Sequence, residues 1–202
     1  MTTYKRFRIS YYSHFLTVIT GSEEVVACVT NTFVIAFKMS YNATIKQEAQ
    51  YAHDLGPAAV EDNFHATYTS VLTEWFPTSR GYVIDHQKFG PGGKPEYIVV
   101  RHAGGVRNPL LIVELKRPSK NTDAGKQEVK NDLVEYIEGR FDLTQYNTIY
   151  GLGGIGLKWM VCKMVKNGRH DLEDVEKWTD DITSDASYAK FSRIAQLVYD
   201  IS

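Results

Sequence analysis

The feature that most constrains the fold of this chain is the apolar run Leu110–Val113, which ends in Glu114-Leu115-Lys116. This composition predicts a buried strand, whose side chains alternate between the two faces of a sheet. Glu114 and Lys116 are therefore expected to point to one side and Leu115 to the other. A carboxylate and an ammonium at the end of a buried strand are costly to desolvate, unless a metal ion or an anionic substrate compensates.

The composition sets the broad class of the protein. At 202 residues, with 43% apolar and 23% charged residues, the chain is long enough for one large globular domain. Cys28 and Cys162 lie far apart, so they predict neither a disulfide framework nor a zinc site, and a reducing compartment is the default. No signal peptide and no membrane-spanning apolar run is recognisable. We therefore expect an intracellular protein, cytoplasmic or nuclear, without a membrane partner.

The net charge of −1 argues against a strongly non-specific nucleic-acid binder, but it conceals an asymmetry. Residues 88–130 contain nine basic and four acidic side chains, whereas residues 171–185 contain seven acidic side chains and one lysine. Both segments are compatible with ordinary solvated surface. The basic segment coincides with the Glu-Leu-Lys strand, and this coincidence indicates instead a polyanionic partner.

Hydrophobic periodicity and turn residues predict a chain that alternates strands and helices. We expect strands over residues 4–19, 25–38, 82–89, 95–102, 109–117, 147–152 and 157–165, with turns at Gly21-Ser22 and Gly90–Gly93. We expect helices over residues 43–54, 57–76, 123–141 and 186–200. The acidic segment 167–185 is expected to form a loop or a short helix.

The strand pairing predicts which charged side chains meet. In an antiparallel hairpin, paired positions have a constant sum of residue numbers. A hairpin centred on Gly105 places Glu96 opposite Glu114, and a hairpin centred near Gly92 places Gln87 close to Glu96. Two carboxylates are then cross-strand neighbours.

This arrangement resembles the PD-(D/E)XK nuclease superfamily, which has the restriction-endonuclease-like fold. Pro95-Glu96 takes the place of the family's Pro-Asp, and Glu114-Leu115-Lys116 matches its (Asp/Glu)-x-Lys. Gln127 and Tyr136 look like the Gln and Tyr that many RecB-type members carry on the helix after the lysine strand.

The resemblance implies an α/β fold with a central mixed β-sheet flanked by helices. It covers about residues 55–165. Within a single domain over residues 1–202, this core is then preceded by an N-terminal β extension over residues 1–54. It is followed by a C-terminal helical segment over residues 166–202.

The resemblance also implies a metal-dependent nuclease that hydrolyses phosphodiester bonds in DNA, with RNA as the alternative substrate. Glu96 and Glu114 would be direct metal ligands, Glu61 a ligand or a water bridge, and the Leu115 carbonyl a further ligand. Lys116 would orient or deprotonate the attacking water, and Gln127 would be a further member of the site.

A carboxylate-held cation neutralises charge on the phosphate and supplies hydroxide near neutral pH. Mg²⁺ suits such a site, with Mn²⁺ as a substitute. Nucleases of this kind often act as dimers, so a homodimer is one expected assembly.

Each assignment has an alternative. Glu114 and Lys116 on their own are also compatible with a surface ion pair on an ordinary strand. Glu96 departs from the usual Asp, Asp85 is a rival first carboxylate, and Glu61 and Gln127 are compatible with ordinary helix surface. At the level of function, the alternatives are a catalytically inactive binding module for nucleic acid or protein, and a toxin-like nuclease.

Overall fold

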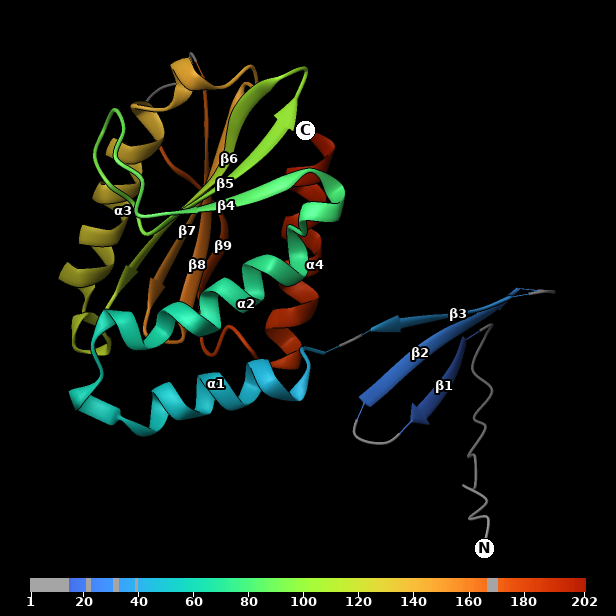
Figure 1. The fold of residues 1–202 in the computed structure, drawn as a ribbon. Coiled ribbons are helices and arrows are strands. Elements are labelled where there is room, and N and C mark those ends of the chain that lie inside the picture. The colour runs from blue at the N-terminus through green and yellow to red at the C-terminus, as the bar shows by residue number, and fades with distance from the viewer. Residues whose placement is uncertain (1–14, 21–22, 31–32, 39, 167–170) are drawn as a thin grey trace, which may run out of the picture.

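The computed structural model describes residues 15–20, 23–30, 33–38, 40–166 and 171–202 (Figure 1). The N-terminal strands β1 (Phe15–Thr20), β2 (Glu23–Thr30) and β3 (Phe33–Lys38) form an antiparallel sheet in the order β1-β2-β3. The sequence predicted one strand over residues 25–38, whereas the structure has two strands there, β2 and β3, which pair antiparallel with Thr30 opposite Phe33. Residues 4–14 of the first predicted strand and the predicted Gly21-Ser22 turn lie outside the described residues.

The main sheet has six strands in the order β4-β5-β6-β7-β8-β9. Their bounds are β4 (Tyr82–His86), β5 (Tyr97–Ala103), β6 (Val106–Lys116), β7 (Thr148–Ile155), β8 (Lys158–Val165) and β9 (Glu173–Thr179). Within this sheet β6 and β7 run parallel and the other neighbours antiparallel. Parallel neighbours need a crossover connection, and here it contains helix α3. The predicted α/β class with a mixed sheet is therefore confirmed.

Helices cover both faces of this sheet (Figure 1). The α-helices are α1 (Ala43–Asp54), α2 (His65–Trp75), α3 (Asp123–Glu138) and α4 (Asp185–Asp200), with 3₁₀ turns η1 (Gly56–Ala58), η2 (Glu61–Phe64), η3 (Thr78–Arg80), η4 (Pro118–Lys120) and η5 (Phe141–Leu143). Buried side chains of α1, α2 and α4 share one core cluster with one face of the sheet, and those of α3 share a second cluster with the other face. No helix in the described part of the chain is both long and apolar enough to cross a membrane.

The predicted helix over residues 57–76 is wrong in its first half. The chain forms the short turns η1 and η2 before α2 begins at His65. Ala59 and Val60 between them are extended, which interrupts any continuous helix. The side-chain oxygen of Asn63 accepts a hydrogen bond from the Val60 amide at 2.8 Å and so fixes the start of η2. Glu61 consequently lies on a tight turn at the end of the sheet and not on a long helix.

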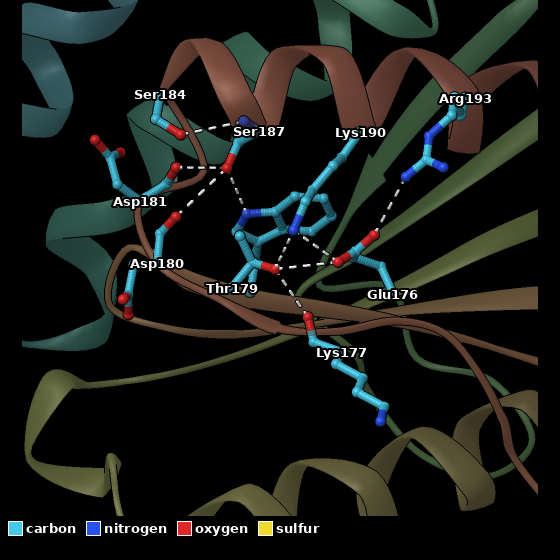
Figure 2. A network of polar contacts seen from close by, with 10 residues as sticks. Glu176, Lys177, Thr179, Asp180, Asp181, Ser184, Ser187, Lys190 and Arg193 are labelled. Carbon is cyan, nitrogen blue, oxygen red and sulfur yellow. Dashed lines mark hydrogen bonds and ion pairs between the residues drawn. The ribbon is translucent and has the colours of Figure 1, made fainter.

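The acidic segment contains a strand that the sequence did not predict. Strand β9 lies at the sheet edge, and its Glu176 pairs with Lys190 of α4 at 2.9 Å and with Arg193 at 3.5 Å (Figure 2). Nearby, Ser187 of α4 accepts a hydrogen bond from the Trp159 indole at 3.0 Å and donates one to the Asp181 carbonyl at 2.7 Å (Figure 2). The Glu176 side chain therefore joins β9 to α4, and the backbone carbonyl of Asp181 joins the following loop to the same helix.

Strand β7 is rich in glycine because helices approach it closely on both faces. A Cβ atom on Gly153 would lie 2.5 Å from a methyl group of Val129 on α3, and one on Gly154 would lie 2.4 Å from the Tyr68 hydroxyl on α2. The sequence predicted that glycines would break the strand after residue 152. They instead lie inside the strand, and the turn comes at Gly156, whose φ is +59°.

Gly153→Ala is expected to lower the free energy of unfolding by about 1–3 kcal/mol, because the added methyl group overpacks the contact between α3 and β7. Urea denaturation measures this loss. Adding Val129→Ala removes the clashing methyl group, so a double-mutant cycle should give a favourable coupling of about 1 kcal/mol. Strictly additive effects of the two substitutions would show that this contact does not set the helix position.

Candidate functional site

The charged pair of the Glu-Leu-Lys strand lies at the C-terminal end of β6 and is largely buried. The side chains of Glu114 and Lys116 are 5% and 16% exposed. The Lys116 ammonium donates hydrogen bonds to Glu114 Oε1 at 2.5 Å and is 2.9 Å from Asp132 Oδ2 on α3. Lys116 is therefore held between two carboxylates, of which the sequence identified one. Asp132 could have been found from its spacing of three residues after Val129 on the buried side of α3.

Glu96 lies next to this pair, as the predicted register requires. Tyr97 pairs with Val113 in the β5–β6 ladder, and continuing this register by one residue places Glu96 opposite Glu114. Gln87 forms two contacts with Glu96: its amide donates to the Glu96 carbonyl at 2.9 Å, and its side chain donates to Glu96 Oε2 at 3.1 Å. The predicted contact of Glu96 with Gln87 is therefore confirmed, and the pairing of Tyr97 with Val113 is the one that the predicted register requires.

A histidine that the sequence analysis did not assign completes the surroundings of Glu96. His65 is the first residue of α2, and its Nε2 lies 3.0 Å from Glu96 Oε2, without the alignment of a regular hydrogen bond. The Tyr97 hydroxyl donates to the His65 carbonyl at 3.1 Å, which fixes the start of α2 against β5. This contact joins residues 32 positions apart in the sequence. No local pattern predicts it.

Glu61 approaches the same cluster from η2. Burial raises the pKa of Glu61, and the neighbouring Glu96 carboxyl raises it further, against the opposing effect of Lys116. Glu61 is thus close enough to both residues for their charges to act on it. The third predicted acid therefore belongs to the group around Lys116, although it comes from a 3₁₀ turn and not from a helix.

The cluster carries an excess of negative charge. Burial raises the pKa of Glu114 to about 7, with Asp132 and Glu96 adding to this effect and Lys116 opposing it. Burial alone would lower the pKa of Lys116, but its hydrogen bonds to Glu114 and Asp132 outweigh burial and raise it. Two carboxylates thus hold one ammonium that stays protonated at neutral pH, and Glu96 and Glu61 are close enough to act electrostatically on members of this group. Such a cluster attracts an additional cation.

Two oxygen atoms beside Lys116 are candidates to bind a cation. Glu114 Oε2 is buried and accepts no hydrogen bond from a described residue. The Lys116 carbonyl accepts from Gly156 on the β7 side, so the Leu115 carbonyl points to the β5 side. The continued register places Pro95 opposite Leu115. Proline has no N–H group to donate, so in this register Pro95 could not donate a hydrogen bond to the Leu115 carbonyl.

The donor chemistry of this cluster fits a hard divalent cation, since Mg²⁺ prefers carboxylate and carbonyl oxygens together with water. However, the carboxylate side chains do not point toward one common position in this structure. Among the described residues, no group of three His, Cys, Asp or Glu side chains is placed to hold a metal ion together. Glu61 and Glu96 would have to turn toward Glu114 for all three to bind the same ion.

A cleft opens at Glu96 and exposes this carboxylate to a ligand. It has a volume of about 420 Å³ and is lined by Asp62, His65, His86, Gln87 and Glu96. A larger pocket of about 460 Å³ lies beyond η2, between α1 and the β7–β8 turn, and no proposed ligand lines it. The smaller cleft is therefore the one that leads to Glu96.

Two other candidate residues make contacts outside the cluster. Asp85 forms ion pairs with Arg107 and, at 3.5 Å, with Lys88, so these cations already neutralise the rival first carboxylate. Gln127 is exposed, and its side-chain amide donates to Asn131 at 2.9 Å. The residue of α3 that contacts Lys116 is thus Asp132.

The raised pKa of Glu114 predicts a pH dependence of stability. A carboxyl group whose pKa rises from 4.5 to about 7 on folding stabilises the fold most below pH 4.5, and this contribution is lost as pH rises through 7. Between pH 5 and 8, metal-free Glu114→Gln should therefore gain about 1–3 kcal/mol of unfolding free energy relative to the wild type. Urea titrations with chelator at several pH values measure this difference. If the difference in unfolding free energy between Glu114→Gln and the wild type does not change with pH, this would contradict the buried environment assigned to the Glu114 carboxyl group.

The comparisons with known proteins add little to this picture. No family model matches the chain, and no curated protein matches it. Among solved structures, it is similar to the type IIG restriction endonuclease BpuSI, at 14% sequence identity and a TM-score of 0.42. The match covers 65% of this chain and 16% of that chain. At this level of similarity the match carries no functional argument.

Proposed function

We propose that this protein is a metal-dependent nuclease that hydrolyses phosphodiester bonds in DNA at the cluster around Lys116. The observation that carries the proposal is the Lys116 ammonium held by Glu114 and Asp132, with Glu96 and Glu61 close to them and with Glu114 Oε2 accepting no hydrogen bond from a described residue. Glu96, Glu114 and the Leu115 carbonyl would hold Mg²⁺ or Mn²⁺, with Glu61 as a further ligand. The bound ion would lower the pKa of a water molecule and neutralise charge on the phosphate.

In this proposal Lys116 acts as a fixed positive charge. Its two carboxylate partners keep it protonated, so it stabilises negative charge that develops on the phosphate and does not accept a proton from water. Asp132 holds the ammonium in place at 2.9 Å. Gln87 and His65 hold the Glu96 carboxylate from the side of the cleft.

A cleavage assay tests the proposal. The purified full chain is incubated with end-labelled single- and double-stranded DNA and with RNA, in Mg²⁺, in Mn²⁺ and in chelator. We expect cleavage of DNA that requires the divalent ion. Absence of cleavage on all three substrates, together with absence of divalent-ion binding in calorimetry, would reject the enzymatic function.

The alternative is a binding module without catalysis, and the lack of a converged group of three ligands among the described residues favours it. Such a module would bind nucleic acid in a salt-sensitive manner without any divalent ion. Its binding would also survive Glu114→Gln, a substitution that should abolish cleavage in the nuclease.

A further inference from the structure

The loop that joins β4 to β5 is built as a rigid unit. Gly90 and Gly93 exchange backbone hydrogen bonds of 3.1 and 3.0 Å across its tip. Gly92 has a φ of +81°, and a Cβ atom there would lie 2.2 Å from the Glu135 carbonyl of α3. The loop therefore lies directly on the C-terminal part of α3, and glycine is what permits this close approach.

The buried side chain of Arg140 holds this loop in place through hydrogen bonds. Its side chain is 1% exposed, and its guanidinium donates to the carbonyl groups of Pro91 at 2.9 Å, Gly93 at 3.0 Å and Lys88 at 3.4 Å. A fourth hydrogen bond, of 3.0 Å, reaches the Tyr136 carbonyl on α3. Because arginine presents several donors in one plane, a single side chain holds several points of the loop.

On this fixed loop, Phe89 is 78% exposed. The Lys94 ammonium lies 5.6 Å from the centre of its ring. An aromatic ring on a rigid backbone loses little conformational entropy when a flat partner stacks on it. The neighbouring cation suits a partner that carries negative charge close to an aromatic group.

The loop also stands next to the candidate site. Lys94 is two residues from Glu96, a distance of at most about 7 Å between Cα atoms. Phe89 is two residues from Gln87, which bonds to Glu96 through both backbone and side chain. A group bound by this loop is thus within one or two nucleotides of a phosphate held at Glu96.

We propose that Phe89 and Lys94 bind an unpaired nucleotide of the substrate, with the base stacked on the Phe89 ring and a phosphate paired with Lys94. This inference rests on the proposed function and specifies its substrate, a strand with unpaired bases beside the scissile phosphate. Aromatic stacking accepts any base but needs an exposed base face, which a continuous duplex does not offer.

Binding measured in chelator separates this inference from catalysis. Fluorescence anisotropy with a labelled 15-nucleotide oligothymidylate and with the matching oligothymidylate–oligoadenylate duplex compares wild type, Phe89→Ala and Lys94→Ala. Phe89→Ala should weaken single-strand binding on the order of 10-fold and leave duplex binding unchanged. Lys94→Ala should weaken single-strand binding and reduce its salt dependence by about one ion. Tyr51→Ala is the matched control, because Tyr51 is 65% exposed on α1 and should have no effect.

A second variant tests the stacking itself. The fluorescence of the new indole in Phe89→Trp should be quenched by the oligothymidylate more strongly than that of the wild type. Unchanged single-strand affinity in Phe89→Ala, or an equal loss on single strand and duplex, would overturn the inference. If the wild type cleaves no substrate while Phe89→Ala still weakens binding to the single strand alone, the proposed hydrolytic function is rejected. The proposed nucleotide-binding role of Phe89 and Lys94 is then retained.

Discussion

Lys116→Met is expected to lower divalent-dependent DNA cleavage by at least about 100-fold, because it removes the fixed positive charge at the phosphate. Methionine retains much of the apolar stem, so packing at the end of β6 is preserved better than with alanine. Initial rates on labelled DNA under saturating Mg²⁺ measure the loss. Lys120→Met is the matched control: Lys120 forms a half-exposed ion pair of 2.8 Å with Glu128 and should be dispensable for cleavage.

Ion binding separates this role from a structural one. Removing the ammonium from beside Glu114 and Asp132 increases the negative excess of the cluster, so Lys116→Met should bind Mn²⁺ at least as tightly as the wild type at pH 8. Glu114→Gln should instead weaken Mn²⁺ binding and cleavage together. Calorimetry with each variant gives the comparison. Cleavage by Lys116→Met at the wild-type rate would contradict the proposed role of the lysine.

Arg140→Ala is expected to have the largest effect on stability, lowering the free energy of unfolding by about 3–5 kcal/mol. The substitution removes one buried cation, takes the arginine donor away from the carbonyl groups of Pro91 and Tyr136, and leaves the Gly93 carbonyl with the Gly90 amide as its donor. Urea denaturation measures the effect. Arg140→Lys should recover only part of it, because one ammonium cannot reproduce the planar set of donors.

The matched control for Arg140 is Arg193→Ala. Arg193 is 74% exposed and its ion pair with Glu176 is 3.5 Å long, so its loss should cost less than about 1 kcal/mol. Arg140→Ala should also lower cleavage at temperatures where the variant is folded, since the loop carrying Glu96 is no longer fastened to α3. An Arg140→Ala protein whose free energy of unfolding lies within about 1 kcal/mol of the wild-type value would contradict the proposed role of Arg140 in holding the β4–β5 loop.

The sequence was sufficient to predict the pairing that brings two carboxylates together. Glycine turns bound both hairpins, and a constant sum of paired residue numbers gives the register near Glu96. A β-bulge between Val99 and Val100, which the sequence analysis did not predict, shifts the pairs nearer the turn by one residue, so that Val100 pairs with Pro109. The structure has Tyr97 opposite Val113 and Gln87 bonded to Glu96, in agreement with that prediction. Local patterns also identified α1 to the residue and the extent of α4 within one residue.

The sequence was not sufficient to predict the elements and residues whose positions depend on long-range contacts. Strand β9 was missed because it is an edge strand whose acidic side chains bind lysine and arginine residues of other elements, such as Lys190. His65 and Arg140 were missed because their partners lie 31 and more than 40 residues away along the chain. Such residues show no periodicity, and only the folded arrangement brings them to Glu96 and its loop.

A crystal soaked in Mn²⁺ and measured at the manganese absorption edge tests the central claim most directly. The claim predicts an anomalous peak within about 2.0–2.4 Å of carboxylate oxygens of Glu96 and Glu114, close to the Leu115 carbonyl. The same peak should be absent from crystals of Glu114→Gln. No peak between Glu96 and Glu114, at an Mn²⁺ concentration that supports cleavage in solution, would contradict the assignment of this cluster as the metal site.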